Sequence, residues 1–354
     1  MLVILSCRAF LRSAIEVSIP GQLRMMHGVN QEFRRSVDVG QHIGVELEEA
    51  QVQARAAWYY YVGGLTQQEV ADRLGITRLR VNRIIGQARA DGLVHIDIRL
   101  PLSSCVELEQ RLVARYGLHA ASVVPSVDDE LVQTQIIGEA SGVLLQPLLY
   151  DGIRLGIGYG GSLRAAVRRL KGVRMPKSRI IALMGGLVTG SELNSFEVCG
   201  EFVRQLGGSC AYITAPIYCP TAEARAALID HGGIADALAE ARKSDIALIS
   251  CGSIDNNAVL DHHDSFSRHR ADLKAAGAVG SILGTFVNDR GDVVDHSLNA
   301  CVMALTLNEL KSIPRRILLT NGLKKLAVTR AALNARLVDT LVTDESVAQA
   351  LLAV

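Results

Sequence analysis

The chain has 354 residues, of which 49% are hydrophobic and 21% charged, and its formal net charge is +1. This length fits two domains of unequal size, and the composition supplies enough apolar side chains for a globular core. A net charge so close to zero excludes a polycationic chain, so any contact with nucleic acid must come from a local basic patch. Only 4% of the residues are aromatic and 32 are glycine, which favours a parallel α/β architecture with tight glycine turns.

The amino-terminal segment and the cysteines indicate neither secretion nor membrane insertion. Residues 1–47 show no clear hydrophobic period, and we expect them to be a poorly ordered extension. The apolar stretch 1–10 lacks the preceding basic region of a signal peptide, and no later uncharged run is long enough to span a bilayer. None of the seven cysteines forms a Cys-x-x-Cys pair, so we expect no zinc site or disulfide framework and a cytoplasmic protein.

A helix-turn-helix pattern lies within residues 48–100, where we predict a small winged helix-turn-helix domain. Residues 66–69 form a capping box that begins one helix, and a second helix runs from Thr77 to about Asp91. Two helices that cross steeply need a small residue at their contact, a glycine in the turn, and apolar anchors on the second helix. The chain supplies these in order as Ala71, Gly75, Val81 and Ile84.

The second of these helices is basic, with no acidic residue between Thr77 and Ala90. Arginine can contact phosphates or guanine, and asparagine can pair with adenine. Residues 94–98 then alternate apolar and polar side chains, which is typical of a half-buried strand and predicts a wing. An ordinary helix pair with a solvated basic face is the alternative, but the combined pattern favours binding to a double-stranded DNA operator. The candidate DNA-binding residues are Thr66, Thr77, Arg78, Arg80, Asn82 and Arg83.

Residues 101–117 are predicted to form a linker helix with an apolar face, begun by a capping box at 104–107. That face packs either on its own domain or on a second copy, and the pattern does not separate the two. Because helix-turn-helix proteins usually bind paired half-sites, we expect a homodimer or homotetramer.

From residue 118 to 354, short apolar β-rich runs alternate with helical stretches, which predicts a doubly wound, mostly parallel α/β domain. Residues 279–287 are predicted as one of its strands. Ligands in such sheets bind beyond the carboxyl ends of strands, where glycine lets backbone N–H groups approach an anion. Predicted strands end in such segments at 155–162, 183–186, 250–253 and 321–325, so we expect an effector pocket there.

Other sites are poorly supported by the sequence. Gly156, Gly158 and Gly161 spell GxGxxG, but no acidic residue for a ribose follows about twenty positions later, so we expect no dinucleotide and no other cofactor. His262 and His263 are adjacent and point in different directions on most backbones, so we predict no metal site.

These segments resemble those of the SorC family of sugar-binding transcriptional regulators, also called SorC/DeoR-type. The resemblance covers most of residues 50–354. It rests on an ordered set of motifs: LTQQEVADRLGITRLRVNRIIGQARADGLVHI, GIGYGGSL, LMGG, DIALISCGS, GAVGSILG, NGLKKLAVTRAAL and LVTDESVAQALL. It implies a cytoplasmic regulator, often a tetramer, whose effector domain is similar to sugar-phosphate isomerases but is not used catalytically.

The resemblance also implies residue roles. Gly160, Gly161 and Ser162 would hold the anionic or hydroxylated end of the effector, Gly185 and Gly186 would line the pocket, and Lys325 would supply positive charge. Two departures are Ser281, where the family often has Asp, and Asn321-Gly322, where it often has Gly-Gly. The candidate effector-binding residues are Gly158, Gly160, Gly161, Ser162, Gly185, Gly186, Gly252, Ser281 and Lys325.

We therefore predict a DNA-binding transcriptional regulator of carbohydrate catabolism genes, a repressor, although the sequence leaves activation open. A sugar, polyol or sugar phosphate would control its operator affinity. The alternative is a sugar-phosphate isomerase-like enzyme with an appended DNA-binding domain, which needs an acid/base pair in its pocket. The candidate carboxylates stand at no spacing that indicates such a pair: Glu192, Asp245, Asp255 and Asp264.

Overall fold

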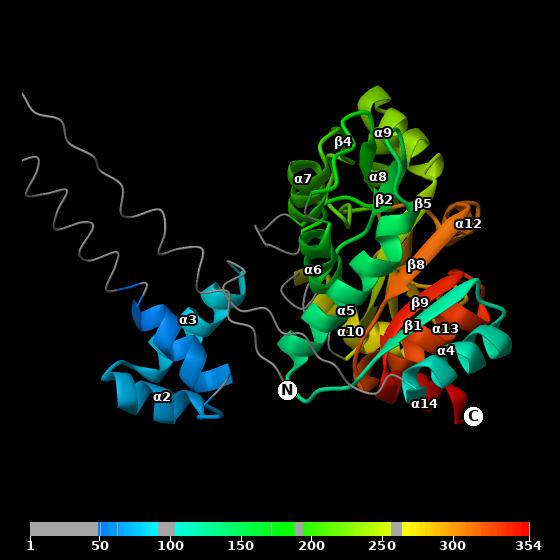
Figure 1. The fold of residues 1–354 in the computed structure, drawn as a ribbon. Coiled ribbons are helices and arrows are strands. Elements are labelled where there is room, and N and C mark those ends of the chain that lie inside the picture. The colour runs from blue at the N-terminus through cyan, green and yellow to red at the C-terminus, as the bar shows by residue number, and fades with distance from the viewer. Residues whose placement is uncertain are drawn as a thin grey trace, which may run out of the picture. The chain divides into compact units, whose positions relative to one another are not determined.

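The computed structural model describes residues 49, 51–61, 63–90, 103–170, 172–187, 194–255 and 264–353. The chain divides into one unit that ends at Arg99 and a second that begins at Leu100 (Figure 1). Several sequence predictions concern residues outside the described ranges: the extension at 1–47, the wing at 94–98, the candidate carboxylate Glu192, and His262 and His263.

The first unit contains the predicted helix-turn-helix. A helix over 51–61 precedes α2 (Gln67–Leu74) and α3 (Arg78–Ala90). The capping box at the start of α2 is present, since Glu69 N donates to Thr66 Oγ1 (3.3 Å) and Thr66 N donates to Glu69 Oε2 (2.7 Å). Gly75 ends α2 in the left-handed region (φ 64°), which glycine adopts without strain. The core of the unit is formed by Ala56, Val70, Ala71, Val81, Ile84 and Ile85.

The second unit is built on a parallel sheet in the order β1-β9-β8-β5-β2-β3-β4. Each neighbouring pair along this path is parallel. The strands are β1 (Ala120–Val124), β2 (Arg154–Ile157), β3 (Arg179–Ala182), β4 (Ser209–Ala211), β5 (Ile246–Ser253), β8 (Arg315–Leu319) and β9 (Thr340–Asp344).

One predicted strand is wrong. Residues 279–287 form a hairpin, in which β6 (Gly280–Ile282) pairs antiparallel with β7 (Thr285–Val287) and with the end of β5. The two residues between the strands both have positive φ, Leu283 at 49° and Gly284 at 77°. That backbone is typical of a two-residue hairpin turn, but leucine is not a residue that signals one.

Both faces of the sheet are covered, as the continuous apolar strands predict. Alternate strand residues such as Leu155, Ile180 and Leu248 share one core with α5, α6 and α7 (Figure 1). The intervening residues, such as Ile181 and Ala247, share another core with α4, α9, α10, α13 and α14. The helices are α4 (Ser103–Tyr116), α5 (Glu130–Leu145), α6 (Gly161–Arg169), α7 (Ser195–Leu206), α8 (Ala222–Ile229), α9 (Gly232–Arg242), α10 (Asp264–Ala275), α11 (Ser297–Ala300), α12 (Leu307–Lys311), α13 (Leu326–Asn334) and α14 (Glu345–Leu352), with short 3-10 helices η1 (Gln146–Leu148) and η2 (Leu323–Lys325).

Helix α4, which the sequence predicts as a linker, packs on the sheet unit. Its buried Leu108 and Leu112 belong to the core that also contains α14. Tyr116 Oη donates to Leu351 O (3.0 Å), and Glu109 Oε1 accepts from Val123 N (2.8 Å). The apolar face of α4 is therefore used within its own unit. Within the described ranges, no helix is long and apolar enough to cross a membrane.

Candidate functional site

Helix α3 presents a basic outer surface. Its anchors Val81, Ile84 and Ile85 are buried, and the predicted DNA-binding residues Arg78, Arg80, Asn82 and Arg83 are exposed. Since these anchors recur at helical spacing, the arginines are left on the solvent side. Thr66 and Thr77 are also exposed, and each caps the start of a helix. Thr66 Oγ1 accepts from Glu69 N at the start of α2, and Thr77 Oγ1 accepts from Arg80 N (3.2 Å) at the start of α3.

Three of the predicted residues have side-chain partners within the first unit, among them Thr66, whose Oγ1 donates to Glu69 Oε2 (2.8 Å). Arg80 Nη2 lies 3.7 Å from Glu49 Oε1, and Asn82 Oδ1 accepts from Gln67 Nε2 (3.4 Å). Among the described residues, Arg78 and Arg83 have no ion-pair partner, so these two guanidinium groups are available for an external anion.

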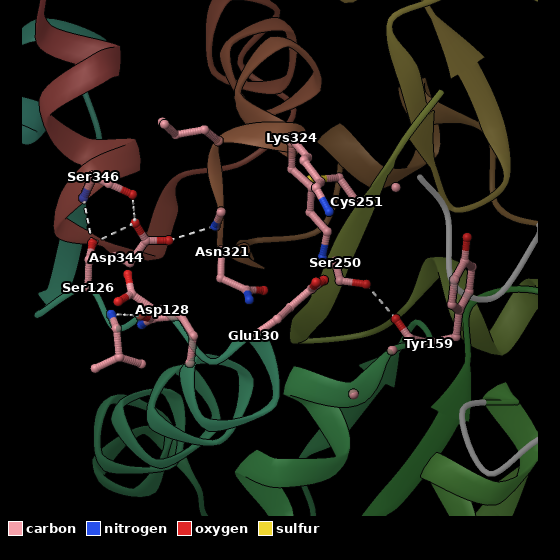
Figure 2. Close-up of a pocket in the computed structure, with 18 residues that line it drawn as sticks. Ser126, Asp128, Glu130, Tyr159, Ser250, Cys251, Asn321, Lys324, Asp344 and Ser346 are labelled. Atoms are coloured by element: carbon pink, nitrogen blue, oxygen red, sulfur yellow. Dashed lines mark hydrogen bonds between the residues drawn. The ribbon is translucent and has the colours of Figure 1, made fainter. Parts of the chain in front are cut away.

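A pocket lies in the second unit, at the carboxyl ends of the neighbouring strands β1, β9, β8, β5 and β2 (Figure 2). It has a volume of about 410 Å³, which is within the range of small-molecule sites. Its lining residues are Ser126, Val127, Asp128, Glu130, Gln133, Tyr159, Gly160, Gly161, Ser250, Cys251, Gly252, Asn321, Gly322, Leu323, Lys324, Lys325, Asp344 and Ser346.

Helix α6 opens onto this pocket at its amino terminus. Gly160 has φ 131° and ψ 158°, a conformation essentially restricted to glycine. A Cβ atom there would lie only 2.7 Å from Ser250 Oγ, which donates to Tyr159 O (2.5 Å). No side chain in the described part of the chain caps α6, so its first N–H groups are left for an anion.

Asp344 organises the opposite side of the pocket. Its buried carboxylate accepts from Gly322 N (2.7 Å) and Val347 N (3.0 Å) and from the hydroxyls of Ser126 (3.1 Å) and Ser346. These bonds join the ends of β1, β8 and β9 and hold the loop that carries the two lysines (Figure 2). Through these four bonds, the Asp344 carboxylate stabilises this wall of the pocket.

The remaining lining includes charged side chains of both signs. Lys324 and Lys325 come from η2, and Asp128 and Glu130 come from the start of α5. Figure 2 shows Glu130 extending toward the side of the pocket where Ser250 lies. Within the described ranges, none of these four residues forms an ion pair. Ammonium and helix N–H groups suit an anionic group, and carboxylates suit hydroxyl donors.

The structure brings together part of the predicted effector-binding set. Gly160, Gly161, Gly252 and Lys325 line the pocket. Ser162 is buried in the first turn of α6, Gly158 lies against Ile249 and Leu283, and Ser281 is buried opposite Gly252 in the β5–β6 pairing; none of these three lines the pocket.

Gly185 and Gly186 also lie outside the pocket lining, and packing accounts for both glycines. A Cβ atom at Gly185 would lie 2.4 Å from Ala215 O, and one at Gly186 would lie 2.5 Å from the Phe196 ring. No larger side chain fits either position unless the neighbouring backbone or the partly buried Phe196 ring moves, because such contacts are shorter than 3.0 Å.

Sequence reasoning missed the contribution of β1 and β9. It did not single out Ser126, Asp128, Glu130, Gln133, Asp344 or Ser346, which all line the pocket. A usable signal existed, since polar residues directly follow the apolar runs at 121–125 and 340–343. A rule that examined every strand end, with or without glycine, would have found them.

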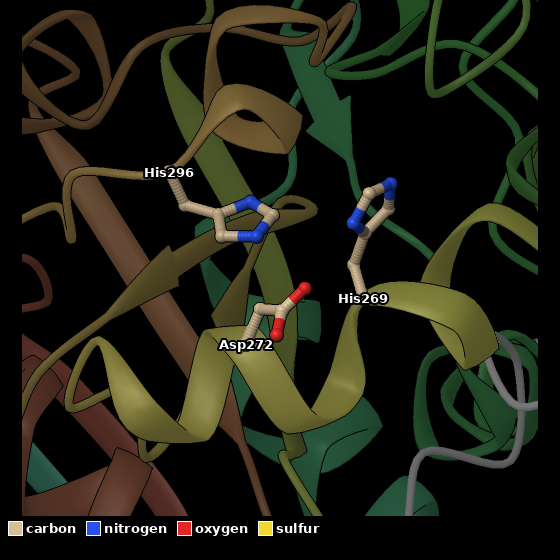
Figure 3. A group of neighbouring side chains, drawn as sticks. All are labelled: His269, Asp272 and His296. Carbon is tan, nitrogen blue, oxygen red and sulfur yellow. The ribbon is translucent and has the colours of Figure 1, made fainter.

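His269, Asp272 and His296 form a separate cluster, in which potential metal-ligand atoms lie within 4.8 Å of one another (Figure 3). His296 Nδ1 accepts from Leu298 N (3.1 Å) as the cap of α11. The neutral ring then carries its proton on Nε2, which has no lone pair for a cation. Burial, together with the neighbouring His269, lowers the pKa of His296. The cluster is better explained as a helix cap with a neutral histidine.

The chain thus combines a helix-turn-helix unit with an α/β unit that carries a small-molecule pocket. Residues 101–353 match the family model described as "Putative sugar-binding domain", and residues 58–90 match region 4 of Sigma-70. The transcriptional regulator LsrR of Escherichia coli O139:H28 is 31% identical over 86% of this chain and 95% of that protein. The erythritol catabolism regulatory protein EryD of Brucella abortus is 30% identical over 84% of this chain and 95% of that protein.

Solved structures show the same fold. The full-length sorbitol operon regulator SorC from Klebsiella pneumoniae superposes with a TM-score of 0.66 at 24% identity, covering 86% of this chain and 99% of that one. The chain belongs to the SorC family of sugar-binding transcriptional regulators.

Proposed function

We propose that this regulator binds a phosphorylated sugar or polyol in the pocket of its second unit and that this binding changes its affinity for operator DNA. The observation that carries the proposal is the pairing of two cationic side chains, Lys324 and Lys325, with the uncapped start of α6 around one cavity. A phosphate fits that combination, because its oxygens accept from ammonium and from helix N–H groups.

The acidic side of the pocket supports a hydroxylated ligand. Asp128 and Glu130 supply acceptors for hydroxyl groups, and Asn321 adds a carboxamide whose Nδ2 donates to Thr134 Oγ1 (3.3 Å). A purely apolar effector would leave these groups desolvated without partners, which is costly. One relative is named for erythritol catabolism, so polyols belong in any screen alongside sugars.

The effector is tested by a thermal-shift screen of the full chain against sugars, polyols and their phosphates. We expect a phosphorylated compound to raise the melting temperature more than its unphosphorylated parent. Lys325→Ala should remove that difference, while Lys311→Ala, a lysine in α12 outside the pocket, should keep it. If every phosphorylated compound and its unphosphorylated parent raised the melting temperature equally, recognition of a phosphate would be excluded.

The basic surface of α3 supports operator binding by the first unit. Arg83→Ala should weaken binding to a promoter fragment from beside the gene and leave the second unit folded, because Arg83 is an exposed residue of the first unit and is not part of that unit's core. Footprinting of wild-type and variant chains checks this, and normal protection by Arg83→Ala would remove this residue from the interface. Repression, a homodimer or homotetramer, and a cytoplasmic location follow as parts of the same proposal.

The structure gives little support to the isomerase alternative. Asp245 accepts from Arg154 N (2.8 Å) and Asp255 pairs with Lys274, and neither lines the pocket. The matched relatives named above are regulators. Asp128 and Glu130 are the carboxylates that an enzyme would use here, so turnover of pentose and hexose phosphates is the direct test. We expect ligand-induced stabilisation without isomerisation.

A further inference from the structure

The outward face of α3 contains two residues that the basic character of the helix does not explain. An α-helix advances about 100° per residue, so the side opposite Val81, Ile84 and Ile85 is occupied by Leu79, Arg83 and Gly86. All three of these outward residues are exposed. A leucine and a glycine therefore flank Arg83 along the centre of the face turned away from the core.

Gly86 has no structural reason to be glycine within the described part of the chain. It lies in the middle of a 13-residue helix, and it is not among the residues with positive φ. Beyond its own turn, nothing lies within 4 Å of the position that a Cβ atom would take. Glycine disfavours a helix relative to alanine, so Gly86 lowers the stability of α3, and no close packing at this position compensates for that loss. A position of this kind is explained when another molecule approaches the helix backbone closely.

Leu79 is the second residue that the basic character of α3 does not explain. Its side chain is 74% exposed on the first turn of the helix, between Arg78 and Arg80. If Leu79 packed against another protein, the three arginines around it would have no evident role. No acidic residue lies on this helix, so its charge is entirely positive and favours an anionic partner. DNA supplies a partner for both kinds of side chain, because its phosphates are anionic and the C5-methyl group of thymine in the major groove is apolar.

We propose that α3 enters the major groove with its Leu79–Arg83–Gly86 face toward the base edges. Leu79 contacts a thymine methyl group, Arg83 reads a base between the two, and Gly86 lets the helix backbone lie against the floor of the groove. This inference rests on the proposed function, and it adds two specificity-determining positions that carry no charge and no hydrogen-bonding side chain.

The test uses the full-length chain and a selection from a random-sequence duplex library. Dissociation constants on the selected duplex are then measured for wild type, Gly86→Ala, Leu79→Ala and Gln87→Ala, an exposed neighbour displaced from the outward direction. Each thymine of the selected site is also replaced by deoxyuridine, which removes only the methyl group. Thermal melting of each free variant is recorded in parallel.

The expected results separate a DNA contact from a structural role. Gly86→Ala should raise the melting temperature of the free protein and weaken binding by about tenfold or more, because alanine favours the helix but its methyl group obstructs the groove. One thymine-to-deoxyuridine change should weaken wild-type binding by about fourfold, the value of one buried methyl group, and should not affect Leu79→Ala. Gln87→Ala should stay within about twofold of wild type on the same scale.

Two results would overturn the inference while leaving the proposed function intact. One is a Gly86→Ala chain that binds the selected duplex as wild type does or that melts at a lower temperature. The other is a Leu79→Ala chain that still distinguishes thymine from deoxyuridine. A wild-type chain that enriches no sequence would overturn the proposed function itself.

Discussion

Gly160→Ala tests the geometry on which the pocket depends. Gly160 combines a backbone conformation that costs other residues about 1–3 kcal/mol with a very close neighbour. A Cβ atom would lie 2.7 Å from Ser250 Oγ, inside the normal contact distance. Relieving such an overlap in a packed site costs about another 1–3 kcal/mol. We expect a total of about 3 kcal/mol, which lowers the melting temperature by roughly 6–12 °C for a unit of this size.

A double-mutant cycle separates the two contributions to the Gly160→Ala effect. With Ser250→Ala in place, the nearest atom to the new methyl group would be the Cβ of residue 250 at 3.5 Å, an ordinary contact. Ser250→Ala by itself loses the hydrogen bond to Tyr159 O, which costs about 1 kcal/mol. The double variant should therefore be more stable than the sum of the single changes predicts, by about 1 kcal/mol or more.

The assay is calorimetry or circular dichroism of the full chain, with effector-induced stabilisation measured on the same samples. Gly277→Ala is the matched control, since Gly277 also has positive φ (84°) but nothing within 4 Å of a Cβ position. It should show the backbone cost alone and keep the effector response. A Gly160→Ala chain that melts within about 1 °C of wild type would refute this description of the α6 start.

Four further predictions test other parts of the molecule. Asp344→Ala should cost about 2–3 kcal/mol in denaturant unfolding, because it leaves Gly322 N and Val347 N without their acceptor, whereas Asp344→Asn should recover part of the loss. Phe202→Ala should destabilise the second unit by about 3–5 kcal/mol, since this ring is fully buried, and a loss below about 1 kcal/mol would contradict that packing. The pKa of His296 is lower in the folded chain than its unfolded value of 6.5, so the folded state favours the neutral ring. The stability that this neutral ring contributes is therefore complete above pH 6.5 and is lost as the pH falls through and below that value. The variant His296→Asn can still cap α11 but does not titrate, so it should flatten the pH dependence of the melting temperature. Lys325→Ala should raise the effector concentration needed to alter DNA binding without changing operator affinity in its absence, and an unchanged induction curve would exclude it from the site.

Local features of the sequence determined much of this protein. The capping box at Thr66, the turn at Gly75 and the anchors on the second helix identify the helix-turn-helix, because capping and helical periodicity act over a few residues. The alternation of apolar strands with helices likewise indicates a covered parallel sheet, and the glycine loop before α6 marks one edge of the pocket.

Only the tertiary structure decided which strand ends meet. Asp344 and Ser126 are 218 positions apart in sequence, and they are joined because β9 pairs between β1 and β8. Gly185 and Gly186 follow a strand as the other glycine pairs do, yet Ala215 and Phe196 fill the space that a ligand would need. Sheet order and side-chain packing arise from contacts between distant segments, so a local pattern can show that a strand ends in a loop but not what lies against that loop.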